Sequence, residues 1–452
     1  MVDSEDEDDD VHSPPGLRVT RSSTRQVALA VGLITAVGLG VVACSGDEPP
    51  RSSARSATPQ QAAGPLRAVP LDGAALDVGA KTNPLPDDPS YFPIGVWLES
   101  VTDPADIEKD QDAGLNLYVG LTANSDLEMV AESDMKVLAH DEWFDRGDDP
   151  GSEAIAGWVL GDEVDMTEGP VRGPRTMQSR LDEVGGDGRL TYANYGKGVM
   201  FWETDAEAAR FVNEFQDIVS NDIYWFTDPN VCGASEGGDL LAGGEELDEA
   251  ECRLAANYGK TVRRMRELVE PAGSKPVWNF VEVGHPFTEE DAPTITAAQA
   301  RAAVWSSIIN GARGIVYFNH SFAGPCVTHH ALREPCYEDV RETVTETNRQ
   351  ITELAPVLNS PTVEGVVQTS SAVETMSKVA DDGTLHVFAA STSHEPQDAQ
   401  LVLTCLEDGE ATVVGEDRTV DVVGGLLEDE FADGDAVHVY RIDGATGCRV
   451  DP

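Results

Sequence analysis

The sequence predicts an α/β protein: a (β/α)8 barrel followed by a small antiparallel β-sandwich. Three observations lead to this fold class. Between residues 91 and 358, short apolar runs alternate with segments of helical period, which is typical of a parallel sheet. We count eight such runs, the number that closes a barrel. Beyond Pro356 the helical period stops and alternation of apolar and polar residues takes over.

The eight apolar runs are interpreted as strands because each is short and bounded by turn residues. In chain order they cover residues 94–98, 115–121, 136–141, 156–163, 189–195, 218–226, 276–283 and 314–321. Helical segments are predicted at 103–113, 126–134, 174–184, 205–215, 251–269, 297–310 and 338–358. The stretch 142–153 contains Pro150 and Gly151 and has no apolar stripe, so we expect a loop in place of the third helix.

The C-terminal part, residues 359–452, is predicted to be a β-sandwich. Its alternating runs lie at 362–369, 384–390, 399–405, 411–414 and 436–442, separated by Gly- and Asp-containing turns. We expect it to cover one side of the barrel rather than to bind sugar by itself.

The first 90 residues are expected to precede the fold. Residues 1–26 form a charged, cytoplasmic n-region, and residues 27–44 contain an uncharged apolar run that ends at Cys44. Such a run after arginines is a secretory signal or a short membrane anchor. Val-Val-Ala-Cys at 41–44 resembles a bacterial lipobox, which implies lipidation of Cys44; an uncleaved anchor is the alternative. Residues 45–90, rich in Pro, Ser and Ala, are predicted to be a disordered linker.

Either interpretation of this segment places the bulk of the chain outside the cytoplasm, attached to the cell membrane. The formal net charge is −50, from 81 acidic and 31 basic residues. A surface this negative repels nucleic acid and anionic lipid headgroups, so neither is expected as a partner. It is typical of a protein that works in high salt. The sequence leaves the oligomeric state open.

Six cysteines remain beside Cys44, an even number that favours disulfides in an exported chain. Neighbours within one predicted loop or domain are the expected pairs, namely Cys232 with Cys252, Cys326 with Cys336, and Cys405 with Cys448. Other pairings stay open. A zinc site is disfavoured because no Cys-x-x-Cys spacing occurs.

Two of the predicted strands, the fourth and the seventh, end in acidic residues. The fourth strand lies in Gly-Trp-Val-Leu-Gly-Asp-Glu-Val-Asp, residues 157–165, and ends at Asp162 and Glu163. The seventh, within 275–286, ends at Glu282. All eight strands of such a barrel present their C-terminal ends to one face, where catalytic groups gather. Two carboxylates there are the minimum for splitting a glycosidic bond, one protonated and one ionised.

Residues 91–358 resemble the glycoside hydrolases of the large (β/α)8 clan that use glutamates at the ends of strands four and seven. The stretch 157–165 is similar to a Gly-Trp-x-x-x-Asp-Glu-Pro version of strand four, and residues 311–318 resemble the eighth strand. The resemblance implies a retaining, cofactor-free hydrolase with Glu163 as acid/base and Glu282 as nucleophile. Asp162 replaces the usual Asn, and Asn319-His320 replaces a frequent aromatic residue, which leaves the sugar open.

Further residues at strand ends are predicted to line the site for the carbohydrate substrate, although packing in the core is the alternative for each. They are Trp97, His140, Asp141, Asp162, Asn194, Tyr195, Tyr224, Trp225 and His320. The sequence contains no His-x-His or His-Glu-x-x-His spacing, so it does not predict a metal site. A second hypothesis is a barrel that keeps the fold and binds glycan or cell-wall polymer without cleaving it.

Overall fold

The structure is a computed structural model that describes residues 65–74, 76–289 and 291–450. The predicted n-region, the apolar run with Cys44 and the first part of the predicted linker lie outside the described residues. Within the described part, no helix is both long and apolar enough to cross a membrane.

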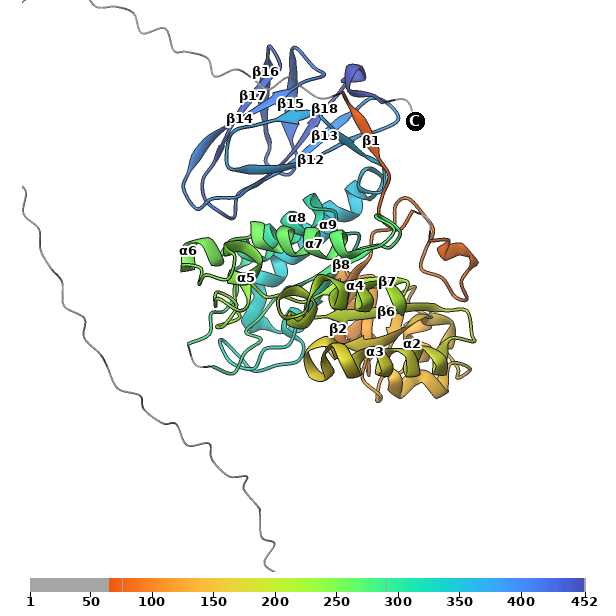
Figure 1. The fold of residues 1–452 in the computed structure, drawn as a ribbon. Coiled ribbons are helices and arrows are strands. Elements are labelled where there is room, and N and C mark those ends of the chain that lie inside the picture. Colours follow the sequence, from red (N-terminus) through yellow and green to blue (C-terminus); the bar gives the residue numbers. More distant parts are fainter. Residues whose placement is uncertain (1–64, 75, 290, 451–452) are drawn as a thin grey trace, which may run out of the picture. The chain divides into compact units, whose positions relative to one another are not determined.

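Eight parallel strands close into a barrel, which confirms the predicted fold class (Figure 1). Closure is made by pairing of the first and last strands, with Ile94 opposite Ile315. The strands are β2 (Ile94–Glu99), β3 (Leu117–Leu121), β4 (Lys136–Ala139), β5 (Ile155–Asp162), β6 (Leu190–Tyr195), β7 (Ile218–Asn221), β8 (Val277–Glu282) and β9 (Ile315–Phe318).

Helices follow most of the strands, and several begin with a capping box that satisfies free backbone N–H groups, as at Thr204 and Thr296. They are α1 (Pro104–Asp112), α2 (Leu127–Ala131), α3 (Val164–Val184), α4 (Asp205–Glu214), α5 (Gly237–Ala242), α6 (Glu249–Cys252), α7 (Ala256–Leu268), α8 (Ala297–Ile309) and α9 (Glu338–Leu358). After β4 the chain forms only the 3-10 turns η2 (Asp141–Arg146) and η3 (Ser152–Ala154), which confirms the expected loop.

The helix α3 begins ten residues earlier than predicted. The helical period of the sequence predicts a start at Pro174. The structure has a break at Gly169, where φ is 66°, and the chain resumes its helical path at Pro170. The helix therefore starts directly after the carboxylates of β5.

Side chains along the barrel strands alternate between two environments. Leu117, Val119 and Leu138 belong to the cluster inside the barrel, with Tyr192 and Phe280. The residues between them on each strand pack instead against the helices. This period of two decides whether a residue at a strand end faces the mouth of the barrel or the helix layer.

The C-terminal sheet is antiparallel and has ten strands in the order β1-β10-β12-β13-β18-β15-β16-β17-β14-β11. Its C-terminal strands are β10 (Thr362–Glu364), β11 (Val367–Gln368), β12 (Val373–Val379), β13 (Leu385–Ser391), β14 (Gln397–Leu403), β15 (Gly409–Val413), β16 (Arg418–Val423), β17 (Leu426–Phe431) and β18 (Val437–Ile442). The strands β12, β16 and β17 are absent from the prediction. Strand β12 lacks a regular alternation because it buries the polar residues Ser377 and Lys378.

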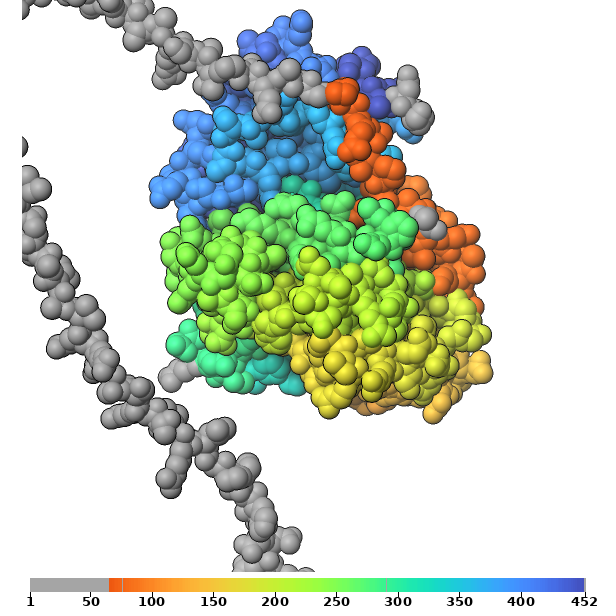
Figure 2. All heavy atoms as spheres, in the orientation of Figure 1, coloured from red at the N-terminus to blue at the C-terminus, as the bar shows by residue number. Residues whose placement is uncertain are grey.

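The prediction of a disordered linker at 45–90 is wrong for residues 65–74 and 76–90, which the structure describes. Strand β1 (Arg67–Val69) pairs with β10, with Arg67 opposite Glu364, and a salt bridge of 2.6 Å joins these two side chains. Figure 2 shows this orange segment lying against the blue sheet and continuing along the barrel. A three-residue edge strand has too few positions to show a period, so the sequence pattern could not reveal it.

One face of the sheet shares a hydrophobic cluster with the helices and outer side of the barrel. Trp305 of α8 stacks on Phe388 of β13, with ring centroids 5.8 Å apart. Glu374 of β12 accepts hydrogen bonds from Ser306 (2.5 Å) and Asn310 (2.8 Å) of the same helix. The apolar and polar contacts together fix α8 against the sheet.

All three predicted disulfides are present. Cys232 bonds to Cys252 across the loop between β7 and α7, and Cys326 bonds to Cys336 in the loop after β9. The third joins Cys405 and Cys448 within the sheet domain. Each closes a loop and so restricts the unfolded chain.

Replacement of Trp305 tests the shared core. Trp305 has no exposed surface, so Trp305→Ala should lower the free energy of unfolding by about 3–5 kcal/mol, measured by chemical denaturation. Trp202, 49% exposed, is the control, and Trp202→Ala should change it by less than about 0.5 kcal/mol. Equal losses in both variants would contradict the shared core.

Candidate active site

The C-terminal ends of β4, β5 and β6 bring three predicted residues to the barrel mouth: His140, Asp162 and Asn194. The ring of His140 lies edge-on to Trp97 of β2, with centroids 4.9 Å apart. The amide of Asn194 donates a hydrogen bond of 3.0 Å to Asp162. Residues from four strands thus form one wall, as the shared face of the barrel predicts.

A chain of hydrogen bonds orients Asp162. Ser220 of β7 donates to the carbonyl oxygen of Asn194 at 2.7 Å, and the hydroxyls of Tyr192 and Ser220 lie 2.5 Å apart. Asp162 is exposed at the mouth although protein surrounds it closely. This partial desolvation raises the pKa of Asp162, and the hydrogen bond from Asn194 opposes the rise.

Glu163 adopts a left-handed backbone conformation, with φ 48° and ψ 33°, at the N-terminal boundary of α3. A non-glycine residue in this region is uncommon and often marks a functional position. The turn directs the carboxyl toward Gly196, where a Cβ atom would lie 2.9 Å from Glu163 Oε1. A side chain at this position would push the Glu163 carboxyl or the Met166 side chain aside.

Burial raises the pKa of Glu163 to about 7, and the nearby charges of Asp162 and Asp165 add to the rise. Lys197 opposes it, but this cation is already paired with Asp228 at 2.6 Å and with Glu236 at 2.7 Å. A carboxyl with this pKa is partly protonated at neutral pH and can act as a general acid.

Asp222 is a site residue that the sequence analysis missed. It follows β7, and its carboxyl lies beside that of Glu163, whose pKa it lowers. Burial raises the pKa of Asp222 well above its usual range, as do the charges of Glu163 and Asp162. Its Oδ1 atom accepts no hydrogen bond from a donor in the described part of the chain.

The signal for Asp222 was present in the sequence. Our predicted strand covered 218–226, so Asp222 lay within it rather than at its end. The strand stops at Asn221, and the period of two that puts Ser220 and Tyr224 on the inner side also assigns Asp222 to that side.

Glu282 lies at the end of β8 but has no exposed surface. The hydroxyl of Tyr258 on α7 donates to both of its carboxyl oxygens, at 2.7 and 2.8 Å, and Thr227 donates at 3.0 Å. Burial raises the pKa of Glu282 to about 7, and these hydrogen bonds oppose the rise. Its catalytic role stays a prediction.

Aromatic side chains form another part of the mouth. Tyr224 contacts Phe318 and Phe287, with centroids 5.4 and 6.3 Å apart, and His320 stacks on His329 at 4.8 Å. Tyr224 is 8% exposed, and its buried hydroxyl has no hydrogen-bond partner among the described residues. A buried polar group of this kind calls for a water or ligand.

Tyr195 and Trp225 do not line the mouth of the barrel, contrary to the prediction. Tyr195 donates to the backbone oxygen of Phe211 at 2.9 Å, and Trp225 donates to Thr261 of α7 at 2.8 Å. Both have no exposed surface and pack against the helices. Each follows an inward-facing residue in the chain, so alternation turns it outward.

The remaining predicted residues lie near the mouth in different settings. Asp141 begins η2 and lies 3.7 Å from Arg180 in an exposed ion pair. Burial lowers the pKa of His140 and of His320 to about 4, so both rings are neutral at pH 7. No group of three or more His, Cys, Asp or Glu side chains within residues 65–74, 76–289 and 291–450 is arranged to hold a metal ion.

No protein-family model and no curated protein sequence matches the chain. Among solved structures, one similar chain is described as a glycoside hydrolase; it is 12% identical, with a TM-score of 0.51 over 78% of this chain and 93% of that one. Another is a family 5 glycoside hydrolase from Bacteroides vulgatus, 13% identical, with a TM-score of 0.51 over 78% and 89%. At this identity the likeness shows the fold.

The raised pKa of Glu163 predicts a pH dependence of stability. The folded state holds a proton on this carboxyl up to about pH 7, whereas the unfolded chain releases it near pH 4.3. Stability should therefore fall as pH rises between these values, by up to roughly 1.4 kcal/mol per pH unit. Glu163→Gln should flatten this slope in denaturation measured from pH 4.5 to 7.5.

The matched control is Glu342→Gln, because Glu342 is exposed on α9. This variant should keep the wild-type slope. An unchanged slope in Glu163→Gln would show that the raised pKa belongs to another group.

Proposed function

We propose that this protein is a glycoside hydrolase that cleaves O-glycosidic bonds of an oligo- or polysaccharide. The observation that carries the proposal is the position of Glu163 at the end of the fourth barrel strand, half-buried, with a pKa near neutrality and the buried carboxyl of Asp222 beside it. The carboxylate motif at 157–165 and the likeness in fold to solved glycoside hydrolases support the same conclusion.

In the proposed first step, Glu163 protonates the glycosidic oxygen as the bond from this oxygen to the anomeric carbon breaks. Asp222 has a pKa raised well above its usual range, so it is protonated at neutral pH and the pair carries at most about one negative charge. A protonated carboxyl does not attack the anomeric carbon, so Asp222 is a positioning residue for Glu163 rather than the nucleophile. It also lowers the pKa of Glu163, which limits the rise caused by burial.

Glu282 is the proposed nucleophile of a retaining mechanism. Its carboxylate would bond to the anomeric carbon as the leaving group departs, and a water deprotonated by Glu163 would then release the sugar. Tyr258 and Thr227 orient this carboxylate. Because Glu282 has no exposed surface, the residues that cover it must move when substrate enters.

The burial of Glu282 favours a second function. If Glu282 stays covered, the mouth can bind glycan or cell-wall polymer through its aromatic side chains without cleaving it. The two functions differ in a simple observable, which is turnover of a bound glycan.

We also propose that the chain is exported and held at the cell membrane, through a lipid on Cys44 or an uncleaved apolar segment. Three disulfides fit an oxidising compartment outside the cytoplasm.

The kinetics of aryl glycoside hydrolysis distinguish the proposed roles of Glu163 and Glu282. Glu163→Gln should lower kcat/KM by roughly 10²–10⁴-fold for poor leaving groups and by much less for dinitrophenyl glycosides, which leave without a proton. Glu282→Ala should abolish hydrolysis for every leaving group. Full activity of Glu282→Ala would contradict its assignment, and tight glycan binding by the wild type without turnover would support the binding function.

Asp222→Ala tests the interaction between the two carboxyls. Because Asp222 lowers the pKa of Glu163, its removal should raise this pKa and move the alkaline limb of the kcat/KM profile up by about one pH unit. Asp141→Ala is the control, since Asp141 lies at the rim in an exposed ion pair. An alkaline limb that stays in place in Asp222→Ala would show that Asp222 does not act on the pKa of Glu163.

A further inference from the structure

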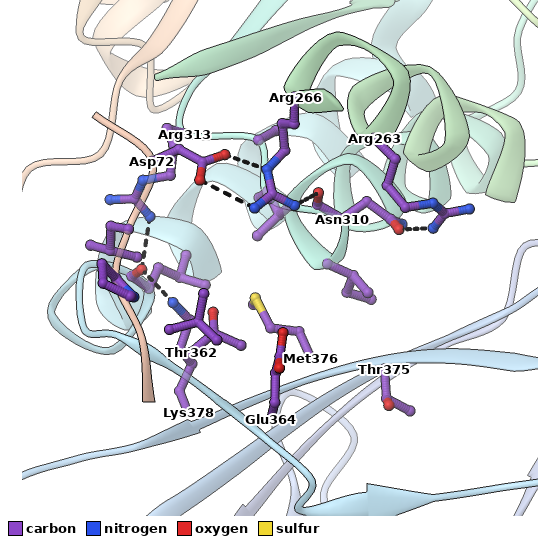
Figure 3. A pocket seen from close by; sticks show the side chains of 18 residues that line it. Asp72, Arg263, Arg266, Asn310, Arg313, Thr362, Glu364, Thr375, Met376 and Lys378 are labelled. Carbon is purple, nitrogen blue, oxygen red and sulfur yellow. Dashed lines mark hydrogen bonds and ion pairs between the residues drawn. The ribbon is translucent and has the colours of Figure 1, made fainter. Parts of the chain in front are cut away.

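A cavity of about 230 Å³ lies between the barrel and the C-terminal sheet (Figure 3). We call it the seam cavity. Its walls come from α7, the end of α8, the segment before β9, strands β10 and β12, and the residues after β1. Four basic side chains line it: Arg263, Arg266, Arg313 and Lys378.

This concentration of basic residues is unusual in a chain with 81 acidic and 31 basic residues. Two of the four have carboxylate partners. Arg266 forms hydrogen bonds with both carboxyl oxygens of Asp72, and Arg263 lies 3.6 Å from Glu374. The other carboxylate of the wall, Glu364, is paired outside the cavity with Arg67.

Arg313 and Lys378 have only neutral hydrogen-bond partners. Arg313 donates to the backbone oxygen of Leu358 at 2.9 Å and to the Asn359 side chain at 2.7 Å. Lys378 donates to the same Leu358 oxygen at 3.2 Å and to the Ser360 oxygen at 2.6 Å. Among the described residues, neither cation forms a salt bridge.

The proximity of the Arg313 and Lys378 cations in the wall of the seam cavity is electrostatically unfavourable. Lys378 is only 2% exposed, and ions removed from water lose several kcal/mol of hydration each. The carbonyl groups at the end of α9 supply a partial negative charge of roughly one half, which does not balance two full charges. One carboxylate, Asp72, serves Arg266 directly and acts on the other two cations only from a distance.

The cavity wall offers the donors that an oxyanion needs. An arginine presents several N–H groups in a fixed fork, an ammonium group has a third N–H beyond the two that Lys378 uses, and Thr362 and Thr375 add hydroxyls. Charge-assisted hydrogen bonds of this kind suit tetrahedral and planar oxyanions.

We propose that the seam cavity binds a small oxyanion of the sulfate or phosphate class, held by Arg313 and Lys378. The site goes beyond the proposed function, because Arg313 precedes β9 and so lies at the opposite end of the barrel from the mouth. Since its walls come from both the barrel and the sheet, the anion stabilises their association.

The proposal predicts a pH dependence. Burial, with the charges of Arg313 and Arg266, lowers the pKa of Lys378 to about 7, and Asp72 opposes this. His386, opposite Lys378 on β13, is neutral because burial lowers its pKa to about 4. Only protonated Lys378 attracts an anion, so affinity should fall as pH rises from 6 to 8.5.

Sulfate is the probe for the test because its charge is constant over this range. Titration calorimetry of the full chain at constant ionic strength should show binding at pH 6 and at least about tenfold weaker binding at pH 8.5. Lys378→Met and Arg313→Gln should each lower the affinity at least about tenfold. The second variant keeps the test decisive if the first does not fold.

Lys275→Met is the matched control. Lys275 is a half-buried lysine that likewise donates to backbone oxygens, those of Val212, Asn213 and Gln216, but it does not line the seam cavity. This variant should bind sulfate as the wild type does. General stabilisation by sulfate acts on all variants alike, so only the difference between variants counts.

Absence of binding at pH 6, or equal affinity in Lys378→Met, Arg313→Gln and the wild type, would overturn the proposal. Parallel titrations with inorganic phosphate and glycerol phosphate distinguish the ligand: preference for the ester indicates a phosphorylated metabolite, and equal binding indicates the free ion. None of these measurements depends on hydrolytic activity.

Discussion

Closure of the barrel is the constraint on which the rest of the molecule depends. Eight short parallel strands satisfy their backbone groups only when the first pairs with the last, as β2 does with β9. Closure brings every strand's C-terminal end to one rim, although these residues are far apart in the sequence. It also fixes which side chains point inward, because the inside and outside positions alternate.

Electrostatics at the rim follow from this crowding. Asp162, Glu163 and Asp222 come from β5 and from the residues after β7, and hydrogen bonds through Asn194 join the two strands. Carboxyls brought this close cannot all ionise, so at least one keeps a proton near neutral pH. The general acid of the proposed function is thus produced by the fold as well as by the residue type.

The rest of the chain supports the barrel from the side. The sheet packs on α8 through Trp305 and Phe388, and strand β1 returns from before the barrel to the edge at β10. Acidic residues dominate the chain, yet basic residues gather at this junction, where Arg266 holds Asp72 beside the helix α7. Attraction between opposite charges therefore acts where the two parts meet.

By itself, the sequence determined the local structure and the composition of the rim. Hydrophobic periods located the eight strands and most helices, and strand-end position identified Asp162 and Glu163. The cysteine pairs were also predicted, because partners close in sequence close short loops. These inferences succeed because they depend on the local period of the chain and on partners within one loop or one domain.

Tertiary structure alone decided the rest. It placed Tyr195 and Trp225 in the core, buried Glu282 with a hydrogen bond from Thr227, and brought Asp222 beside Glu163. Such outcomes depend on the exact end of a strand, on which loop covers it, and on charges brought together from separate strands. A sequence pattern has no information on distances between residues that meet only when the barrel closes.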